Sequence, residues 1–438
     1  MADTASFSND AIAAEARELH ELAQHLAEHA PQLSSPISRL EAAFEKSLAH
    51  AAHPLDAEQA AETFARRLRR VWLEAAGAEA GSVYRSPTAS EVERIARHHD
   101  AFGYERDLQP ETLEARATAF FPAPPAGWTQ DHLIFSSGQA AMTSALLGLS
   151  QRLSPRPFNG QPIRIAHRGA YFETRALIKL MPLLQEATFA QTADIVLDEP
   201  ICCDGQFHQI DTKKLLSSHP QAVIFDTTLL GRDDGVATYL ASLGEKSPIV
   251  LRITSCLKLF EAGLELANAG ILSVYSRGAD DLGTELRRIR TLTGSGISLA
   301  DAIALEAPWF LDAQEADRYA AAIFAHNARL AEAVSANNQR FVPVTHPSLS
   351  GANAPYCAFQ LRHASPDAYD ALESEIIAEA TSRRLLLHHG GSFGFRGHRF
   401  EIVKPETGEP LFLRVALGRR AGWSCEGVVA MMSEIAGQ

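Results

Sequence analysis

A short β-type run passes directly into a glycine turn and a helical run at residues 132–142, which read HLIFSSGQAAM. His132–Phe135 has the apolar character of a strand, and the Ala/Leu-rich stretch Ala141–Leu149 favours a helix. Ser137 and Gly138 stand at the junction. Amides at a helix N-terminus, with a glycine that allows close approach, make a ready phosphate site. Alone the stretch proves little, because many such junctions hold no ligand.

Five more apolar β-type runs follow, separated by Ala/Leu-rich helical stretches. The runs are Ile163–Ala166, Asp194–Leu197, Ala222–Phe225, Ile249–Arg252 and Gly270–Tyr275. Such alternation predicts a mostly parallel sheet with helices on both faces. Because ligands of these sheets bind at the carboxyl ends of strands, the residues that follow each run are candidates for a site.

The first hundred residues read as helix. One apolar set recurs at helical spacing from Ile12 to Leu26, and a second from Ala60 to Trp72. Asp56 is a candidate N-cap of the second helix, which Gly77 and Gly81 would end. We expect a helical arm or cap that packs on the main body or on a second subunit; a partner-binding extension is the alternative.

A third pattern begins near residue 300. A long helical stretch covers Ala313–Val334 and another lies near Asp367–Arg383. β-type runs occur at Arg340–Val344, Tyr356–Leu361 and Leu411–Leu417. This pattern predicts a smaller α/β lobe with an antiparallel sheet.

Composition narrows the class of protein. A chain of 438 residues with 46% hydrophobic and 21% charged residues is typical of a globular protein with two or three domains. The net charge of −13 argues against a nucleic-acid binder. The sequence contains no run of about 18 apolar residues, so no membrane span is predicted. Five cysteines without a CxxC pair, and an N-terminus unlike a signal peptide, favour a cytoplasmic protein without a zinc framework. Adjacent His388 and His389 rarely converge on one ion, so we expect no metal site.

Two strand ends carry residues suited to chemistry. Asp226 closes the run Val223–Asp226, where a buried carboxylate is costly unless it is paired, for instance with a protonated ring nitrogen. Lys258 follows the run that ends at Ser255, and a lysine among hydroxyl and apolar groups can lose its proton and form a Schiff base. The ordinary alternatives are an aspartate that caps a loop and a surface lysine.

The order of these features is informative: a phosphate turn, a tyrosine, a strand-end aspartate, a strand-end lysine and an arginine in a late strand. It resembles the fold-type I pyridoxal-phosphate (PLP) enzymes, most closely the Cys/Met-metabolism family of cystathionine γ-synthase, cystathionine lyases and methionine γ-lyase. The resemblance runs from about residue 100 to the C-terminus. It implies an aspartate-aminotransferase-like PLP-binding large domain at 101–305 and a small C-terminal α/β domain at 306–438, preceded by the helical extension at 1–100.

The resemblance also implies roles around the pyridine ring. Lys258 matches the Schiff-base lysine of a Ser-x-Thr-Lys motif. Asp226, in Asp-Thr-Thr228, matches the aspartate that binds the pyridine nitrogen, and Thr228 belongs to the same cofactor site. Tyr171 matches the tyrosine that stacks on the ring, and it could also act as an acid or base.

Further positions match the family's phosphate ligands. Ser137, Gly138 and Gln139 resemble its Ser-Gly-Met turn, and Ser255 resembles its phosphate-binding serine.

The remaining matches concern the substrate and a second subunit. Tyr104 and Arg106 resemble a segment that reaches a neighbouring subunit's phosphate, which implies a homodimer or homotetramer with shared sites. Arg414 resembles the arginine that takes the substrate carboxylate. Ser392, at the end of His389–Ser392, resembles a small-lobe residue that binds substrate.

Several departures indicate a divergent member with an unusual substrate. Leu257 replaces a phosphate-binding threonine, Gln139 replaces methionine, and Phe172 and Glu173 replace a Gly-Gly pair and should crowd or charge the pocket. An insertion around Arg396–Glu409 separates the small-lobe motif from the late arginine.

The implied activity is PLP-dependent γ-replacement or γ-elimination on a γ-activated α-amino acid, O-acyl-homoserine-like or S-adenosylmethionine-like. The divergence favours specialised amino-acid or natural-product biosynthesis, with carbon–carbon bond formation as one option. A PLP-dependent β-lyase acting on cysteine-type substrates is one alternative. A catalytically silent PLP-fold interaction protein is another.

Overall fold

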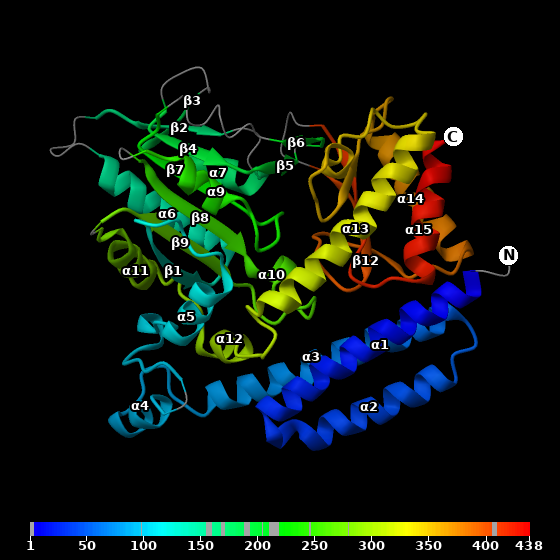
Figure 1. Ribbon diagram of the computed structural model, residues 1–438, viewed down its shortest axis with the longest axis horizontal. Helices are drawn as coiled ribbons and strands as arrows, with labels where there is room; N and C mark the ends of the chain where they lie inside the picture. The colour runs from blue at the N-terminus through cyan, green and yellow to red at the C-terminus, as the bar shows by residue number, and fades with distance from the viewer. Residues whose placement is uncertain are drawn as a thin grey trace.

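The structure is a computed structural model that describes residues 4–97, 99–154, 160–167, 171–187, 193–203, 205–209, 219–244, 247–278, 280–404 and 410–438. Three helices lie along one side of the molecule, beside a large sheet with its helices and a smaller α/β lobe (Figure 1). The exact division at residues 100 and 305 stays a prediction. No helix in the described ranges is long and apolar enough to cross a membrane.

The N-terminal part consists of α1 (Thr4–His29), η1 (Pro31–Leu33), α2 (Ser34–Ala49) and α3 (Pro54–Gly81). The apolar spacing is confirmed, since Leu19 and Leu26 of α1 and Leu68 of α3 are fully buried. Asp56 is not the N-cap of α3. His53 caps the helix, because Pro54 starts it three residues earlier than expected, and Asp56 accepts from the His53 amide at 2.9 Å. Gly77 lies inside the helix.

The large sheet has the order β1-β9-β8-β7-β4-β2-β3. Its strands are β1 (Thr129–Phe135), β2 (Ile163–His167), β3 (Leu184–Ala187), β4 (Ile195–Asp198), β7 (Ala222–Asp226), β8 (Ile249–Ser255) and β9 (Gly270–Ser276). Neighbours from β8 to β3 run parallel, and β9 is antiparallel to both β1 and β8. The predicted α/β class is confirmed, and each predicted apolar run forms a strand. The edge strand β3 was missed because its residues are polar and partly exposed.

The helices and short strands of this part fill the connections. They are α4 (Ala89–Ile95), η2 (Glu105–Asp107), α5 (Glu111–Phe120), α6 (Gly138–Leu153), α7 (Phe172–Leu180), β5 (Ile201–Cys203), β6 (Phe207–Gln209), α9 (Val236–Ser242), α10 (Cys256–Leu259), α11 (Leu282–Thr293) and α12 (Leu299–Ala304).

The small lobe consists of α13 (Ala313–Asn337), η3 (Pro347–Ser350), β10 (Cys357–Phe359), α14 (Pro366–Ser382), β11 (Leu387–His389), β12 (His398–Val403), β13 (Phe412–Ala416) and α15 (Trp423–Ala436). Its sheet has the order β10-β13-β12-β11.

The predicted antiparallel pairing of the small-lobe sheet is confirmed for β10, β13 and β12, but β11 and β12 pair in parallel. A parallel pair cannot be joined by a tight hairpin, so residues 390–397 form a longer excursion that reaches the large domain. The expected strand at Arg340–Val344 is reduced to one bridge between Phe341 and Leu361. The insertion at Arg396–Glu409 supplies β12, and its residues 405–409 lie outside the described ranges.

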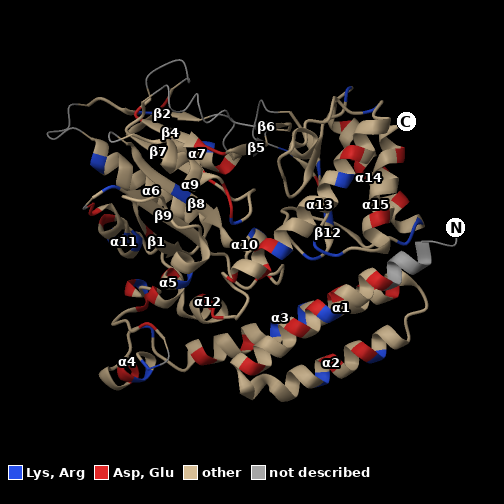
Figure 2. Ribbon diagram, in the orientation of Figure 1, with Lys and Arg blue, Asp and Glu red and all other residues tan. Residues whose placement is uncertain are grey.

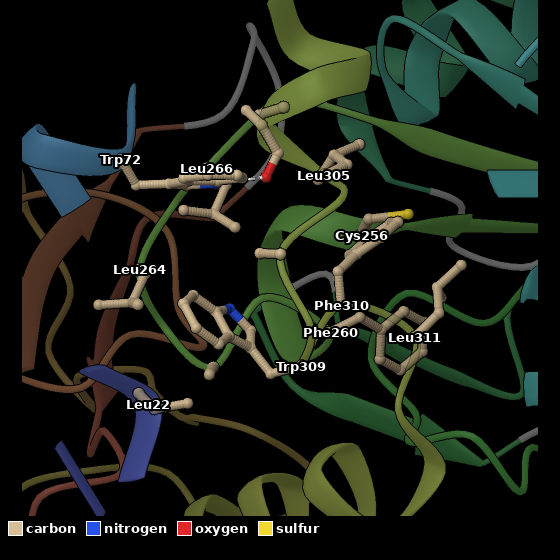
Figure 3. Close-up of a cluster of buried hydrophobic side chains, with 14 of the residues drawn as sticks. Leu22, Trp72, Cys256, Phe260, Leu264, Leu266, Leu305, Trp309, Phe310 and Leu311 are labelled. Carbon is tan, nitrogen blue, oxygen red and sulfur yellow. Dashed lines mark hydrogen bonds between the residues drawn. The ribbon is translucent and has the colours of Figure 1, made fainter. Parts of the chain in front are cut away.

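An apolar cluster attaches the N-terminal helices to the body of the same chain (Figure 3). It includes Leu22 and Trp72 of these helices and Phe260, Leu264 and Leu266 from the segment after α10. The Trp72 indole also donates to the carbonyl of residue 304 at 2.7 Å. Burying each large apolar side chain stabilises the fold by about 1.5–3 kcal/mol. The helices therefore pack on the body of their own chain, which is one of the two arrangements that the sequence analysis expected for a helical cap.

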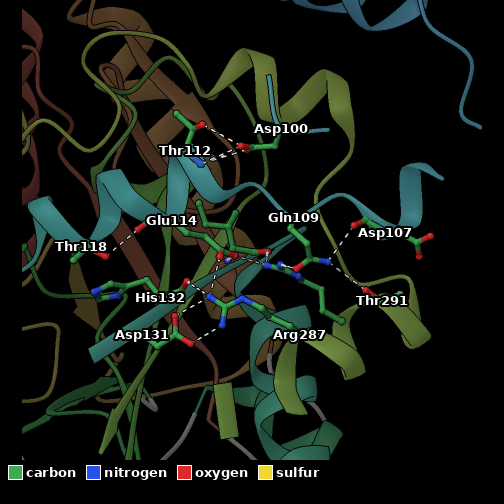
Figure 4. A network of polar contacts seen from close by, with 12 residues as sticks. Asp100, Asp107, Gln109, Thr112, Glu114, Thr118, Asp131, His132, Arg287 and Thr291 are labelled. Carbon is green, nitrogen blue, oxygen red and sulfur yellow. Dashed lines mark hydrogen bonds and ion pairs between the residues drawn. The ribbon is translucent and has the colours of Figure 1, made fainter. Parts of the chain in front are cut away.

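A polar network fixes the entry to the glycine turn from the opposite side (Figure 4). Glu114 of α5 accepts from Arg290 of α11 at 2.6 Å and from the Ile134 amide of β1 at 3.1 Å. Arg287 binds both Glu114 and Asp131. These contacts tie α5 and α11 to the strand that leads into α6, and so position the turn.

Candidate active site

The carboxyl ends of β7 and β8 are joined through Thr228. Its amide donates to Asp226 Oδ1 at 3.0 Å, and its hydroxyl accepts from the Ser255 amide at 3.1 Å. Lys258 lies just beyond, in α10, which Figure 1 shows between the large sheet and α13. The strand-end aspartate, serine and lysine therefore belong to one site.

Lys258 is held by the small-lobe excursion. Its Nζ donates to Ser392 Oγ at 2.5 Å and lies 5.4 Å from the Phe393 ring centroid. Burial, together with the charge of Arg414, lowers the pKa of Lys258. No carboxylate in the described ranges forms an ion pair with this ammonium group. The environment therefore shifts the balance toward the neutral amine, which is the nucleophilic form.

Gly394 permits this close approach. Its φ is +84°, and a Cβ at this position would clash with the backbone carbonyl of Lys258. Only glycine fits both the conformation and the space.

A second buried carboxyl group, that of Glu199, lies close to Asp226. Glu199, after β4, is buried and accepts from the Tyr171 amide at 2.6 Å. Burial and then the neighbouring Asp226 raise the pKa of Glu199 well above its ordinary value, and burial raises the pKa of Asp226. Asp198 lies beside Tyr239 on the other face of the sheet, where burial raises its pKa to about 7 and its Oδ1 has no hydrogen-bond partner in the described chain. A cationic ring nitrogen beside Asp226 would stabilise its ionised form, which burial alone disfavours.

Sequence reasoning missed Asp198 and Glu199. A signal for them existed, because they follow the apolar run Asp194–Leu197 just as Asp226 follows its own run. The motif order drew attention to Asp226 alone.

Tyr171 stands at the start of α7, with 39% of its surface exposed. Burial of its hydroxyl, and then the charge of Glu173, raise the pKa of Tyr171 to about 12. Arg414 acts in the opposite direction, and Asp226 and Glu199 add to the increase. Tyr171 thus shares the site with the aspartate and the late arginine, and Glu173 charges the pocket as expected.

Arg414 of β13 is already paired. Glu401, directly opposite it on β12, accepts from Arg414 Nη2. The Arg414 Nε is buried without a hydrogen-bond partner among the described residues. Glu401 was not predicted, because it lies in the insertion. A substrate carboxylate at this arginine would have to share or displace Glu401.

The glycine turn closes the site on its other side. A Cβ on Gly138 would lie 3.2 Å from Ser255 Cβ, and a Cβ on Gly270 would clash with the Ser137 carbonyl. Ser137 Oγ caps α6 by accepting from the Ala140 amide at 3.0 Å. The first amides of α6 have no partner within the helix, so this glycine-walled turn fits a phosphate.

Gln139 faces α7 and not the opening of the turn. Its Nε2 donates to Thr174 Oγ1 at 3.2 Å. The exchange of methionine for glutamine therefore joins α6 to α7, near Tyr171.

Tyr104 and Arg106 lie elsewhere. They line a hollow of about 300 Å³ together with Arg85, Gly294 and residues 296–298. Tyr104 is 48% exposed, and the Arg106 guanidinium lies 5.3 Å from its ring centroid. The structure does not bring this pair to Lys258 within one chain, and a role in a second subunit stays a prediction.

Solved structures share this fold. A methionine γ-lyase from Micromonospora echinospora has 17% identity and a TM-score of 0.56 over 81% of this chain and 92% of its own. Cystathionine γ-lyase from yeast has 15% identity and a TM-score of 0.55 over 77% and 88%. Cystathionine γ-synthase from Xanthomonas oryzae pv. oryzae has 16% identity and a TM-score of 0.55 over 76% and 89%. The chain thus has the fold of fold-type I PLP enzymes.

Sequence comparison adds no closer relative. No protein-family model matches the chain, and no curated protein sequence matches it. In the described ranges, no group of three or more His, Cys, Asp or Glu is arranged to hold a metal ion.

Proposed function

We propose that the protein is a PLP-dependent enzyme that performs γ-elimination or γ-replacement on a γ-activated α-amino acid. One observation carries the proposal. A lysine that pairs with no carboxylate among the described residues and the acidic pair of Asp226 and Glu199 lie at adjacent strand ends, in the fold of the γ-lyases and γ-synthases named above.

The residues present fit the coenzyme. Lys258 would hold it through Nζ, Asp226 would pair with its ring nitrogen, and the turn at Ser137 and Gly138, with Ser255, would take its phosphate. Leu257 offers no hydroxyl, so the turn amides carry more of this binding. When bound, PLP supplies an electron sink that stabilises a carbanion on the amino acid.

The protein's own groups would move protons around that carbanion. Lys258, with its lowered pKa, can accept a proton at Nζ, and Ser392 Oγ fixes the position of that atom. Tyr171 would stay protonated and could donate a hydrogen bond to a leaving group, although its pKa, raised to about 12, makes it a weak acid. Arg414 would bind the substrate carboxylate through its planar fork once Glu401 shares it.

The side chain of the substrate is the finer part of the proposal. O-acyl-homoserine-like and S-adenosylmethionine-like substrates both carry a leaving group at the γ carbon, and either fits a specialised biosynthetic role, including carbon–carbon bond formation. The competing activity is β-elimination from a cysteine-type substrate. A silent PLP-fold interaction protein is disfavoured, because it would have no need to retain Lys258, Asp226 and Arg414 together.

Product analysis tests the reaction class. The purified protein, loaded with PLP, is incubated with O-acetyl-homoserine, S-adenosylmethionine and cysteine, and the keto acids are identified. Release of 2-oxobutyrate, or of a γ-substituted amino acid when a nucleophile is added, is the expected result. Pyruvate alone would establish the β-lyase alternative, and no turnover with retained PLP would favour the silent protein.

A further inference from the structure

A second cavity lies between the N-terminal helices and the two lobes. It has a volume of about 280 Å³ and lies between α3, residues 263–265 and residues 388–399 of the small lobe. That is several times the roughly 30 Å³ that a water molecule occupies in the liquid. We call it the basic cavity.

Arginines dominate its lining. Glu62 and Glu265 are its only acidic residues in the described chain, and His388 and His389 also face it. Figure 2 shows acidic and basic residues interspersed along the surface helices. A cluster of side chains with the same charge is therefore unusual for this molecule. Five arginines line the basic cavity: Arg66, Arg69, Arg396, Arg399 and Arg420.

Two of these guanidinium groups are buried and carry N–H donors that have no hydrogen-bond acceptor among the described residues. Arg396 is 4% exposed and Arg420 is 1% exposed. On the side of α1, Arg420 Nε donates to Glu15 at 2.9 Å and Arg396 Nη1 donates to Glu18 at 2.8 Å.

The other ends of the two groups have no such partner. The Nη2 of Arg396 and both terminal nitrogens of Arg420 have no hydrogen-bond partner among the described residues. Glu62 is 3.7 Å from Arg420 Nη1, an ion pair without a hydrogen bond. Buried charged donors are rarely left without an acceptor unless a ligand supplies one.

Most carboxylates around the cavity are already hydrogen-bonded. Glu15 Oε1, which has no hydrogen-bond partner among the described residues, lies 3.5 Å from Arg396 Nε, on the side of α1. Glu62 pairs with Arg66 and lies 3.0 Å from His388 Nε2. Glu265 is 3.6 Å from Arg399. Arg419, behind the cavity, takes the second oxygen of Glu18 at 2.5 Å. None of these groups fills the space in front of Arg396 and Arg420.

We propose that the basic cavity binds the phosphate or carboxylate group of a small anionic molecule. The group would accept hydrogen bonds from Arg396 and Arg420, with Arg66 and Arg399 at the rim. One hydrogen bond links the wall of the cavity to the loop that contacts Lys258. Arg399 Nη1 donates to the Gly391 carbonyl at 3.2 Å, and the next residue, Ser392, holds Lys258.

Direct binding tests the site independently of any reaction. Isothermal titration uses inorganic phosphate and the PLP-loaded full-length protein, so that the coenzyme's own phosphate site is filled, at constant ionic strength set with chloride. The proposal expects saturable binding that Arg66→Gln weakens by about three- to tenfold. The matched control is Arg67→Gln, the next residue on α3, which does not line the cavity and should leave the affinity within about twofold.

A second pair of variants keeps the test decisive. Ala65 lines the cavity, so Ala65→Glu places a carboxylate before the free guanidinium donors and Ala65→Gln places a neutral group of equal size there. The Glu variant should melt at the higher temperature at low salt and gain nothing from phosphate. Absent phosphate binding, equal affinities in Arg66→Gln and Arg67→Gln, or a Glu variant no more stable than the Gln variant would overturn the proposal.

The source of the anionic group is decided in the same titration. Phosphate binding is repeated with saturating O-succinyl-homoserine and with O-acetyl-homoserine, which lacks the distal carboxylate. Competition by the succinyl compound alone assigns the cavity to the tail of the substrate. Competition by neither assigns it to a separate anionic ligand.

Discussion

At the scale of single residues, the pairing of Arg414 with Glu401 sets the cost of binding a substrate carboxylate. The two lie opposite each other on β13 and β12 and are mostly buried. Because Glu401 occupies part of the guanidinium, an incoming carboxylate meets a partly neutralised arginine. This pair therefore tunes substrate affinity.

Replacing Glu401 tests that reading. Glu401→Gln should tighten the binding of an α-amino acid by about threefold, the worth of a partly exposed ion pair. Glu401→Asp should keep the charge and the affinity near those of the native protein. The measurement is the dissociation constant of a slow substrate analogue, and weaker binding in Glu401→Gln would show that Glu401 orients Arg414 without competing for it.

Single residues also show what sequence can and cannot reveal. Asp226 and Lys258 were found because each follows an apolar run, and a strand end is visible in sequence. Glu401 was hidden because its role depends on the cross-strand partner across an insertion, and cross-strand register is not written in local spacing. The roles assigned to these residues remain predictions.

At the scale of elements, the excursion 390–397 is the device that delivers Ser392 to Lys258. It exists because β11 and β12 are parallel, which the sequence did not predict. Local patterns gave most strands and helices, but the direction of short strand pairs depends on packing between distant segments.

Gly394→Ala tests the closeness of this excursion to α10. A Cβ at Gly394 would clash with Lys258 backbone, so we expect a loss of about 2–4 kcal/mol in the free energy of unfolding. Gly351→Ala is the matched control, because its φ of +85° is similar but nothing lies within 4 Å of the added Cβ. It should lose only about 1 kcal/mol. Denaturant unfolding measures both, and equal losses would refute a tight contact.

His99 links three segments and makes their attachment depend on pH. Its ring lies 2.7 Å from Glu306 and 2.6 Å from Glu79 of α3. The hydrogen bond to Glu306, then the one to Glu79, raise the pKa of His99 to about 9, against an opposing effect of burial.

The sign of the effect follows from the raised pKa. Protonated His99 stabilises the fold fully below about pH 6.5, the unfolded value, and this contribution is lost as pH rises through about 9. The native protein should therefore exceed His99→Gln by about 1–3 kcal/mol in unfolding free energy at pH 6, and the gap should close by pH 10. A gap that does not change with pH would contradict a charged His99.

At the scale of the whole molecule, the N-terminal helices are bound into the body by both apolar and ionic contacts. Figure 3 shows their apolar cluster reaching the segment after α10, and Arg396 and Arg420 pair with Glu18 and Glu15 of α1. The sequence showed that these helices exist, but their docking depends on residues hundreds of positions apart, which periodicity does not reveal.

Assembly gives a prediction for the exposed pair Tyr104 and Arg106. We propose that they complete a neighbouring subunit's site in a homodimer or homotetramer. Mixing inactive Lys258→Ala with inactive Arg106→Ala after subunit exchange should then restore about a quarter of native activity, because half of the dimers gain one intact site. In the control experiment, Arg85→Ala takes the place of Arg106→Ala in the mixture, because Arg85 lines the same hollow. Failure to regain activity in verified mixed oligomers would place the pair outside the site.

The central claim is that Lys258 binds PLP covalently. The most direct measurement is to reduce the PLP-loaded protein with borohydride, digest it and locate the added pyridoxyl mass, using Lys258→Ala and the exposed Lys404→Ala as paired variants. The account predicts the modification on the peptide that contains Lys258, its loss in Lys258→Ala and its retention in Lys404→Ala. A modification on another lysine, or none in a protein saturated with PLP, would contradict it.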